Sequence, residues 1–388
     1  MSQTERLAST RATVEGLLAE MGIPDVSPDS VLVAPTSPPG GRVLLENIDR
    51  FHHFVFRFAL TVRFVGYPID EIAGLTVEQF CEKYVSESYP EIPTEPLSEN
   101  QYPFDQNREP TPPVGEVNEF PICFVLGVGR SGTTLLRTML NMHEKLWAPG
   151  ELHLANYGGM ADRAARIIPT LRHMPVPEIA ARLGESAEAF LETFQGWESA
   201  DLSISEVYQT LHEADPDTWI VDKTPTYSAS VEGLARIGQM FPNARFVHLV
   251  RSPHDVIQSL VRMQLYKGLA ARVEPGLNPF HMAEVAWFAH NENIETFLNT
   301  VPSARHTRVR YEELVSDPEE PLRAICDLLT RSYDPAMADP YKQSSRRIAL
   351  GAGDPTVNAL RSVEKRTPRD AFYPLGAPSR RLAQGHGY

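Results

Sequence analysis

The chain has 388 residues, enough to bury a large core, and a formal net charge of -14. This acidity argues against a general nucleic-acid binder, because such proteins present a basic face to the phosphate backbone. The three cysteines are scattered and lack CxxC spacing, so they indicate neither a zinc site nor a disulfide framework. The first residues contain no apolar segment of a secretory signal, and arginines interrupt the apolar stretch 51–67. We therefore expect a soluble protein of the reducing cytoplasm.

The first part of the chain predicts a small helical region. Residues 4–21 place apolar side chains at helical spacing, and residues 43–65 carry a second, more aromatic helix pattern. A third, shorter pattern covers residues 75–84, where Thr76 is a candidate N-cap and Gln79 stands at capping-box distance. These three patterns together are expected to form a helical unit.

Composition sets the expected boundaries of the helical region, and its layout is similar to that of one known domain type. Residues 1–95 form the helical region, and prolines among acidic and polar residues make 96–118 an expected linker before a main domain of residues 119–388. The helical region is similar in layout to an acyl-carrier domain, since Gly40–Leu44 reads GGRVL where carriers have GG-x-S-L. Val43 replaces the serine that would carry phosphopantetheine, which excludes carrier function and leaves an unrelated helical cap as the alternative.

A phosphate-binding loop is predicted at residues 120–141, which read as a strand, a tight loop and a helix. Gly127 and Gly132 stand at the two glycine positions of a Walker loop, and Thr134 stands at its closing hydroxyl position. Small residues let backbone amides converge on an anion, and the helix N-terminus adds its positive dipole. We therefore expect an oxyanion of phosphate type here, the alternative being a glycine-rich turn of an ordinary α/β domain.

The Walker lysine is missing from this loop. Thr133 stands in its place, while Arg130 offers a positive charge from another direction. In nucleoside triphosphatases that lysine and a magnesium ion neutralise the β- and γ-phosphates. The loop therefore favours an anion other than the end of a triphosphate.

Three more buried strands are predicted, and they set the fold class. They alternate with helix patterns, so we expect an α/β fold: a P-loop-like three-layer domain with a central, mostly parallel sheet. Ligands of such sheets gather outside the carboxyl ends of the strands, where Lys223 and Arg251 fall. The predicted strands cover residues 218–221, 244–250 and 307–311.

The remaining helix patterns and the last segment of the chain give less information about function. Residues 282–298 and 321–329 read as helices, and Trp287 and Phe288 of the first one are expected in the core. Residues 344–388 show little periodicity and are interpreted as a lid or wrap. Basic residues in this segment read as a solvated face, with contact to an anionic ligand as the alternative; they are Arg361, Lys365 and Arg366.

These pieces resemble the sulfotransferases that use 3′-phosphoadenosine 5′-phosphosulfate, from about Pro121 to the end of the chain. The RSGTT of Arg130 to Thr134 looks like the 5′-phosphosulfate loop of that family. FVHLVRSPHDVIQS, Phe246 to Ser259, looks like its 3′-phosphate element, with the same arginine-to-serine spacing. The resemblance accounts for the missing lysine, because a phosphosulfate replaces the β/γ-diphosphate, and it implies no metal ion.

The resemblance also implies binding roles, residue by residue. Arg251 and Ser259 would bind the 3′-phosphate, and Tyr311 matches a tyrosine that contacts the nucleotide in tyrosylprotein sulfotransferases. Arg130 and Lys223 would neutralise charge on the transferring sulfuryl group and its bridging oxygen. The residues implied to bind the 5′-phosphosulfate are Ser131, Gly132, Thr133 and Thr134.

A general base is the remaining requirement, since the acceptor hydroxyl must lose its proton as its oxygen attacks sulfur. Glu151 matches the catalytic glutamate of tyrosylprotein and related sulfotransferases and is our first choice. His153 is the rival, because imidazole titrates near neutrality and cytosolic members of the family use histidine. Either residue could instead tie down the turn, and His143 is interpreted as structural.

The acceptor is suggested only by likeness within the family. The run GELHL at 150–154 and the closing residues 380–383 with Gly387 and Tyr388 look similar to sulfotransferase domains of modular polyketide synthases. The RKGxxGxWK stretch of the cytosolic steroid and phenol enzymes is absent. We therefore expect sulfuryl transfer to a hydroxyl of a specialised metabolite or of a carrier-bound β-hydroxyacyl chain. The alternatives are a P-loop kinase for a small hydroxyl compound and a non-catalytic nucleotide-binding protein.

Overall fold

A computed structural model describes residues 3–20, 23, 26–27, 29–30, 75–86, 92–102, 117–167, 171–263, 265, 277–341 and 371–388. The chain forms two compact units. The first comprises Met1–Ile92, Gln258–Gly268 and Asn278–Phe280, and the second comprises the other residues. The predicted helix at 43–65, the carrier-like residues 40–44 and the basic residues at 361, 365 and 366 lie outside the described residues.

The first unit contains two helices that pack together, α1 (Gln3–Glu20) and α4 (Val77–Ser86). Both confirm predicted helices. The amide of Thr76 donates to the Gln79 side chain at 2.9 Å, and the amide of Gln79 donates to the Thr76 hydroxyl at 3.1 Å, which confirms the predicted capping box. The apolar residues buried in this unit include Val14, Leu17, Leu18, Val77, Phe80 and Cys81.

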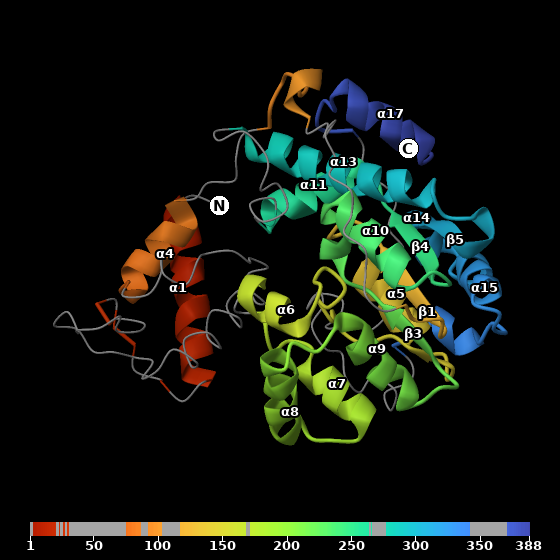
Figure 1. The fold of residues 1–388 in the computed structure, drawn as a ribbon. Coiled ribbons are helices and arrows are strands. Elements are labelled where there is room, and N and C mark those ends of the chain that lie inside the picture. Colours follow the sequence, from red (N-terminus) through yellow and green to blue (C-terminus); the bar gives the residue numbers. More distant parts are fainter. Residues whose placement is uncertain are drawn as a thin grey trace. The chain divides into compact units, whose positions relative to one another are not determined.

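The second unit is built on a five-stranded sheet in the order β2-β3-β1-β4-β5, in which every pair is parallel (Figure 1). The α/β prediction is confirmed, and the three predicted strands and the one before the phosphate loop are all present. Only the two-residue edge strand was not predicted, because two residues are too few to show a period. The strands are β1 (Ile122–Leu126), β2 (Leu146–Trp147), β3 (Trp219–Asp222), β4 (Arg245–Val250) and β5 (His306–Arg310).

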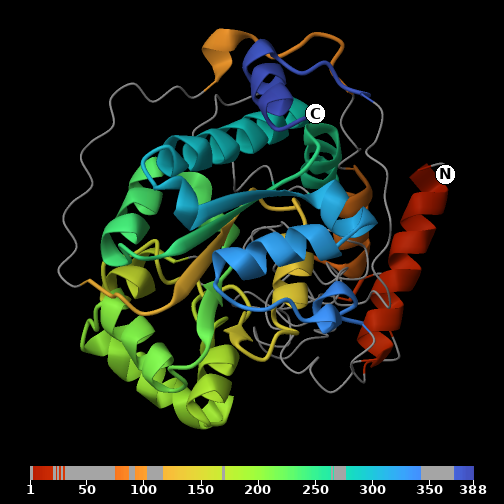
Figure 2. The same cartoon turned by 90° about the vertical axis from the view of Figure 1, so that its right-hand side faces the viewer.

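Helices cover both faces of the sheet (Figures 1 and 2). Successive side chains of a strand point to opposite faces, so Phe124 joins one buried cluster and Val125 the other. The first face packs against α7 (Val176–Leu183), α8 (Ala187–Ser199), α9 (Ile204–Glu213), α10 (Val231–Met240) and α13 (Pro279–Leu298). The second packs against α5 (Thr133–Leu140), α14 (Tyr311–Ser316) and α15 (Glu319–Leu328).

Other helices complete the described chain: α6 (Met160–Arg166), α11 (Pro253–Arg262) and α17 (Ala377–Gly385). Trp287 and Phe288 of α13 are buried, as predicted. Among the described helices, none combines the length and apolar character needed to cross a membrane.

The last segment differs from the prediction, because α17 lies inside the stretch that showed little periodicity. This helix is short and mostly polar, so an apolar repeat could not reveal it. Its stability comes from distant contacts at its end. Arg308 donates to the Gly385 carbonyl at 3.2 Å, Arg310 donates to the Gly387 carbonyl at 3.0 Å, and the Tyr388 hydroxyl donates to Glu312 at 2.5 Å.

One buried carboxylate joins the expected linker region and the last segment to α13. Glu284 accepts the Tyr102 hydroxyl at 2.5 Å, the Tyr373 hydroxyl at 2.6 Å and the Gly376 amide at 2.9 Å. Burial and the nearby Glu284 charge raise the pKa of both tyrosines, so both hydroxyls remain donors. Residues 93–102 therefore pack within the second unit, where Glu99–Gln101 forms a short 3₁₀ helix.

This carboxylate makes a stability prediction. We expect Glu284→Ala to lower the free energy of unfolding by about 2–4 kcal/mol, because two buried hydroxyls and one amide lose their acceptor. Glu292→Ala on the same helix should change it by less than about 0.5 kcal/mol. Urea denaturation of both variants checks this, and equal losses would contradict the role given to Glu284.

Candidate active site

The phosphate loop leaves β1 and enters α5 with the geometry that an anion cradle needs. A Cβ atom at Gly127 would lie 2.7 Å from the Leu249 carbonyl oxygen, so only glycine fits there. Gly132 has φ +95° and caps α5, while Thr133 and Thr134 occupy the first turn. The first amides of a helix have no intrahelical acceptor, and they point toward the loop.

Arg251 lies against this loop, where the family resemblance predicts that both elements bind one nucleotide. Its guanidinium donates to the Arg130 carbonyl at 3.1 Å and stacks 4.1 Å from the centre of the Tyr311 ring. That ring also faces Gly132, where an added Cβ would collide with it. The ends of β1, β4 and β5 therefore gather the 5′ loop, the predicted 3′-phosphate arginine and the predicted nucleotide tyrosine in one place.

Buried polar atoms in this place that lack hydrogen-bond partners among the described residues include the Ser131 hydroxyl and the Arg251 Nε. Buried polar groups are normally hydrogen-bonded, so these two atoms fit a site built for an anionic ligand. Ser259 lies on α11, in a part of the chain that groups with the first unit, and its contact with the 3′-phosphate stays a prediction.

The two candidate bases lie together with Lys223. The fully buried Lys223 ammonium contacts one Glu151 oxygen at 2.6 Å, and His153 Nε2 lies 3.3 Å from the other oxygen. His153 adopts a left-handed backbone conformation with φ 49°. Arg163 donates to the His153 carbonyl at 2.9 Å and helps to hold that conformation.

The electrostatics of this group favour an ionised carboxylate. Burial alone would raise the pKa of Glu151, but the Lys223 charge and the His153 hydrogen bond outweigh it and lower the pKa from 4.5 to about 2. Burial lowers the pKa of Lys223, and the Glu151 charge opposes that change. Glu151 therefore carries the charge that a general base requires, with its proton affinity suppressed by Lys223.

Arg137 is a buried cation that the sequence reasoning missed. It lies one helical turn after Thr133 and donates to the Ala148 carbonyl at 3.3 Å, just before the turn that carries Glu151. Its Nε and Nη2 atoms have no partner among the described residues, and burial lowers its pKa. An arginine inside an apolar helical run was the available signal. The predicted structural role of His143 is confirmed, since its ring bonds the Ser332 carbonyl and the Lys145 amide.

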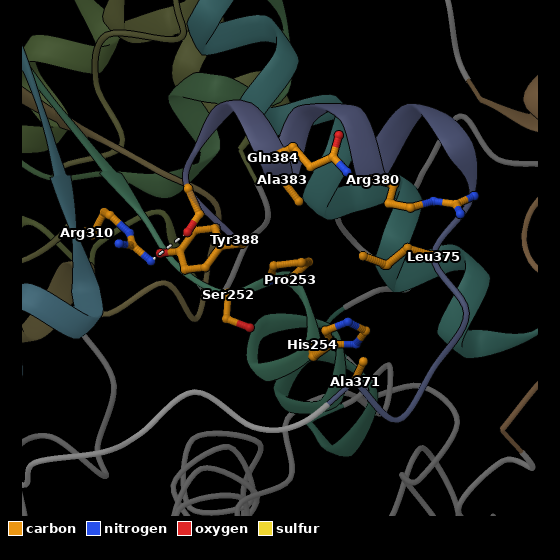
Figure 3. A pocket seen from close by; sticks show the side chains of 11 residues that line it. Ser252, Pro253, His254, Arg310, Ala371, Leu375, Arg380, Ala383, Gln384 and Tyr388 are labelled. Atoms are coloured by element: carbon orange, nitrogen blue, oxygen red, sulfur yellow. Dashed lines mark hydrogen bonds between the residues drawn. The ribbon is translucent and has the colours of Figure 1, made fainter.

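A cavity of about 410 Å³ opens at Ser252, the residue that follows Arg251 in the chain (Figure 3). It lies between the start of α11, the end of β5 and the last segment, and Arg310 and Tyr388 stack along one side at 4.6 Å. The sequence did not predict it, because its walls come from segments far apart in the chain. Its lining includes Ser252, Pro253, His254, Arg310, Leu375, Arg380 and Tyr388.

A cluster of His248, Glu295 and His386 is close enough together to hold a metal ion. The Arg308 guanidinium, however, lies 2.6 Å from the same Glu295 oxygen that faces both imidazoles. Burial would raise the pKa of Glu295, but the imidazole hydrogen bonds and Arg308 outweigh it and lower the pKa. The cluster therefore ties the last segment to β4 and α13 through contacts of both imidazoles with the Glu295 carboxylate.

Comparison with known proteins identifies the family of this chain. Residues 121–335 match the model of the Sulfotransferase family. The chain belongs to this family. It is similar to the sulfotransferase domain from the curacin biosynthetic pathway, with 31% identity and a TM-score of 0.63 over 70% of this chain and 99% of that domain. The sulfotransferase domain of the Synechococcus PCC 7002 olefin synthase gives 29% identity and a TM-score of 0.62 over 72% and 98%.

Curated relatives agree at lower identity. The chain is 27% identical over 237 residues to nodulation protein NoeE of Sinorhizobium fredii, which is 57% of this chain and 52% of that protein. It is 25% identical over 224 residues to protein-tyrosine sulfotransferase 1 of Danio rerio, 56% of each chain. The chain thus spans about half the length of these relatives.

The phosphate loop makes the second prediction. Gly132→Ala should lower the free energy of unfolding by about 2 kcal/mol or more, because its φ is left-handed and the new Cβ meets the Tyr311 ring. Gly196→Ala is the control, since this exposed helical glycine has open space around it and should gain about 0.5–1 kcal/mol. Urea denaturation measures both, and a neutral Gly132→Ala would contradict the cradle geometry.

The Lys223–Glu151 ion pair makes the third prediction. In Lys223→Met the pKa of Glu151 should rise from about 2 to above 4.5, because burial persists while the opposing charge is gone. A depressed carboxyl pKa stabilises the fold above pH 4.5, and that contribution is lost as pH falls from 4.5 toward 2. In the variant, where the pKa of Glu151 in the folded protein lies above 4.5, this acid loss should disappear, and the carboxyl should instead cost stability as pH rises through that pKa.

Carboxyl ¹³C NMR titration measures this shift, with the Glu151 signal assigned by its disappearance in Glu151→Gln. A midpoint that remains near 2 in Lys223→Met would show that another group lowers the pKa.

Proposed function

We propose that this protein transfers the sulfuryl group of 3′-phosphoadenosine 5′-phosphosulfate to a hydroxyl group. One observation carries the proposal: the Arg251 guanidinium bonds the Arg130 carbonyl at 3.1 Å, so two separate anion-binding elements meet at the end of one sheet. A ligand with an anion at each end of an adenosine suits two such elements. Thr133 in place of the Walker lysine counts against a triphosphate.

The chain's own residues would hold this donor in an extended position. The loop from Ser131 to Thr134 binds the 5′-phosphosulfate, while Arg251, Ser259 and Tyr311 bind the 3′-phosphate and nucleoside. The cavity lined by Ser252, Pro253 and Arg310 would give the nucleoside end room. No metal ion is needed in this proposal, because Arg130, Lys223 and the start of α5 supply the positive charge.

Glu151 accepts the proton of the acceptor hydroxyl in this mechanism. Its carboxylate is ionised and lies beside Lys223, whose ammonium neutralises charge on the sulfuryl group and its bridging oxygen. When Lys223 turns toward that oxygen, the proton affinity of Glu151 rises, because the charge that suppresses it moves away. His153 holds the second carboxylate oxygen at 3.3 Å and keeps the base aimed.

The acceptor we propose is a hydroxyl of a specialised metabolite or of a β-hydroxyacyl chain on an acyl carrier. Support comes from the sulfotransferase domains of the curacin biosynthetic pathway and of an olefin synthase, which this chain covers almost completely. The cytoplasm is the expected compartment, since the three cysteines are all free and buried.

Radiolabelled sulfate transfer tests the proposal and makes the fourth prediction. Full-length protein should sulfate at least one member of a panel of free hydroxy acids and carrier-bound β-hydroxyacyl chains. Glu151→Gln should lower kcat by about 100- to 10,000-fold, whereas His153→Gln should lower it by about tenfold, because the glutamate takes the proton and the histidine only aims it.

Two other results would reject the proposal. Stronger thermal stabilisation by ATP with magnesium than by adenosine 3′,5′-bisphosphate would favour a kinase. Binding of the bisphosphate without transfer to any acceptor in the panel would favour a non-catalytic nucleotide-binding protein. Full activity of Glu151→Gln would assign the base elsewhere.

A further inference from the structure

One buried carboxylate lies close to Lys223, the cation of the Lys223–Glu151 pair. Asp222 ends β3 and directly precedes Lys223, and it is fully buried. Three hydroxyls donate to it: Tyr227 at 2.6 Å and Tyr208 to one oxygen, and Thr224 at 3.1 Å to the other. A carboxylate surrounded in this way is satisfied without any charged partner.

Two of those hydroxyls also hold the turn that carries Glu151. The Tyr227 oxygen accepts the amides of Leu154 and Ala155, both at 3.3 Å. The Thr224 oxygen accepts the amide of His153 at 3.4 Å. Three consecutive amides of the turn are therefore bound by hydroxyls that Asp222 orients.

The direction of these bonds explains why a carboxylate is required. An ionised aspartate only accepts hydrogen bonds, so each hydroxyl must donate to Asp222, which leaves the lone pairs of Tyr227 and Thr224 to accept the turn amides. A neutral or apolar residue at this position would leave the hydroxyls free to rotate away from the turn. Asp222 thus helps to fix the turn amides through the Tyr227 and Thr224 hydroxyls, although it does not contact those amides itself.

We propose that Asp222, Tyr227 and Thr224 are positioning residues that fix the turn at 151–155 and thereby hold Glu151 against Lys223. The proposal rests on the proposed function, because Glu151 is the base only in a sulfuryl transfer. None of the three is assigned a contact with donor or acceptor. The left-handed backbone of His153 supports the idea, since such a conformation persists only where surrounding bonds enforce it.

Tyr208 provides a matched control within the same cluster. It is as buried as Tyr227 and bonds the same Asp222 oxygen, and its hydroxyl lies 3.4 Å from that of Tyr227. It comes from α9, however, and makes none of the hydrogen bonds to the turn amides, which go to Tyr227 and Thr224. Removal of the Tyr208 or the Tyr227 hydroxyl breaks a similar hydrogen bond to Asp222, but only removal of the Tyr227 hydroxyl also breaks hydrogen bonds to the turn.

The test, our fifth prediction, compares Tyr227→Phe with Tyr208→Phe in the full chain. Tyr227→Phe should lower kcat by about 10- to 100-fold, because a misplaced base is inefficient, while the KM for the donor changes by less than about twofold. Tyr208→Phe should retain kcat within about threefold. Equal losses of kcat in the two variants would mean that the cluster contributes only to core packing, which would overturn the proposal.

Amide hydrogen exchange gives a readout that does not depend on activity. Peptides that contain Leu154 and Ala155 should exchange about tenfold faster in Tyr227→Phe and at the wild-type rate in Tyr208→Phe. If Tyr227→Phe does not fold, Thr224→Val tests the same anchor through the amide of His153. Unchanged exchange in the turn would overturn the proposal. Faster exchange in a protein that transfers no sulfate would support the anchor and reject the sulfuryl-transfer assignment.

Discussion

The parallel register of β1 against β4 is the constraint on which the site depends. Leu126, the last residue of β1, pairs with His248, two residues before β4 ends at Val250, so Gly127 passes directly beside the Leu249 carbonyl. Neither strand could slip by one residue without moving its buried side chains to the wrong face. Because the register is fixed, the phosphate loop and Arg251 leave the sheet side by side, although more than a hundred residues separate them in sequence.

Charge is organised locally in a chain that is acidic overall. Arg137 and Lys223 both interact electrostatically with Glu151, while Arg251 lies against the carbonyl of Arg130 in the phosphate loop. Removing two such charges from water is costly, and a contact of 2.6 Å with further hydrogen bonds is needed to offset that cost. The same contact lowers the proton affinity of Glu151 until Lys223 binds another partner. Binding of the donor to Lys223 is thereby linked to proton transfer to Glu151.

The sequence predicted the parts of the fold that have a local signal. The glycines of the phosphate loop, the long apolar strands and the Thr76–Gln79 capping box each depend on nearby residues, and the structure contains all of them. Helix α17 and the cavity could not be predicted, because long-range bonds such as that from Arg310 to Gly387 create them.

The candidate site divides in the same way. Glu151, Lys223 and Arg251 were found because their neighbours form recognisable motifs. Asp222 and Arg137 were missed, since a single aspartate or arginine in an apolar run carries no spacing that points to its distant partners. Their roles become visible only when β3, α5 and the turn at 151–155 are placed against one another.

Isothermal titration with two nucleotides tests the central claim, that one ligand bridges the loop and Arg251. Wild-type protein should bind adenosine 3′,5′-bisphosphate about 100-fold more tightly than adenosine 5′-phosphate, because Arg251 contributes charge-assisted bonds to the 3′-phosphate. Arg251→Ala should reduce this preference to about fivefold or less, while Arg245→Ala, at the other end of β4, should keep it. A preference that survives in Arg251→Ala would contradict the account.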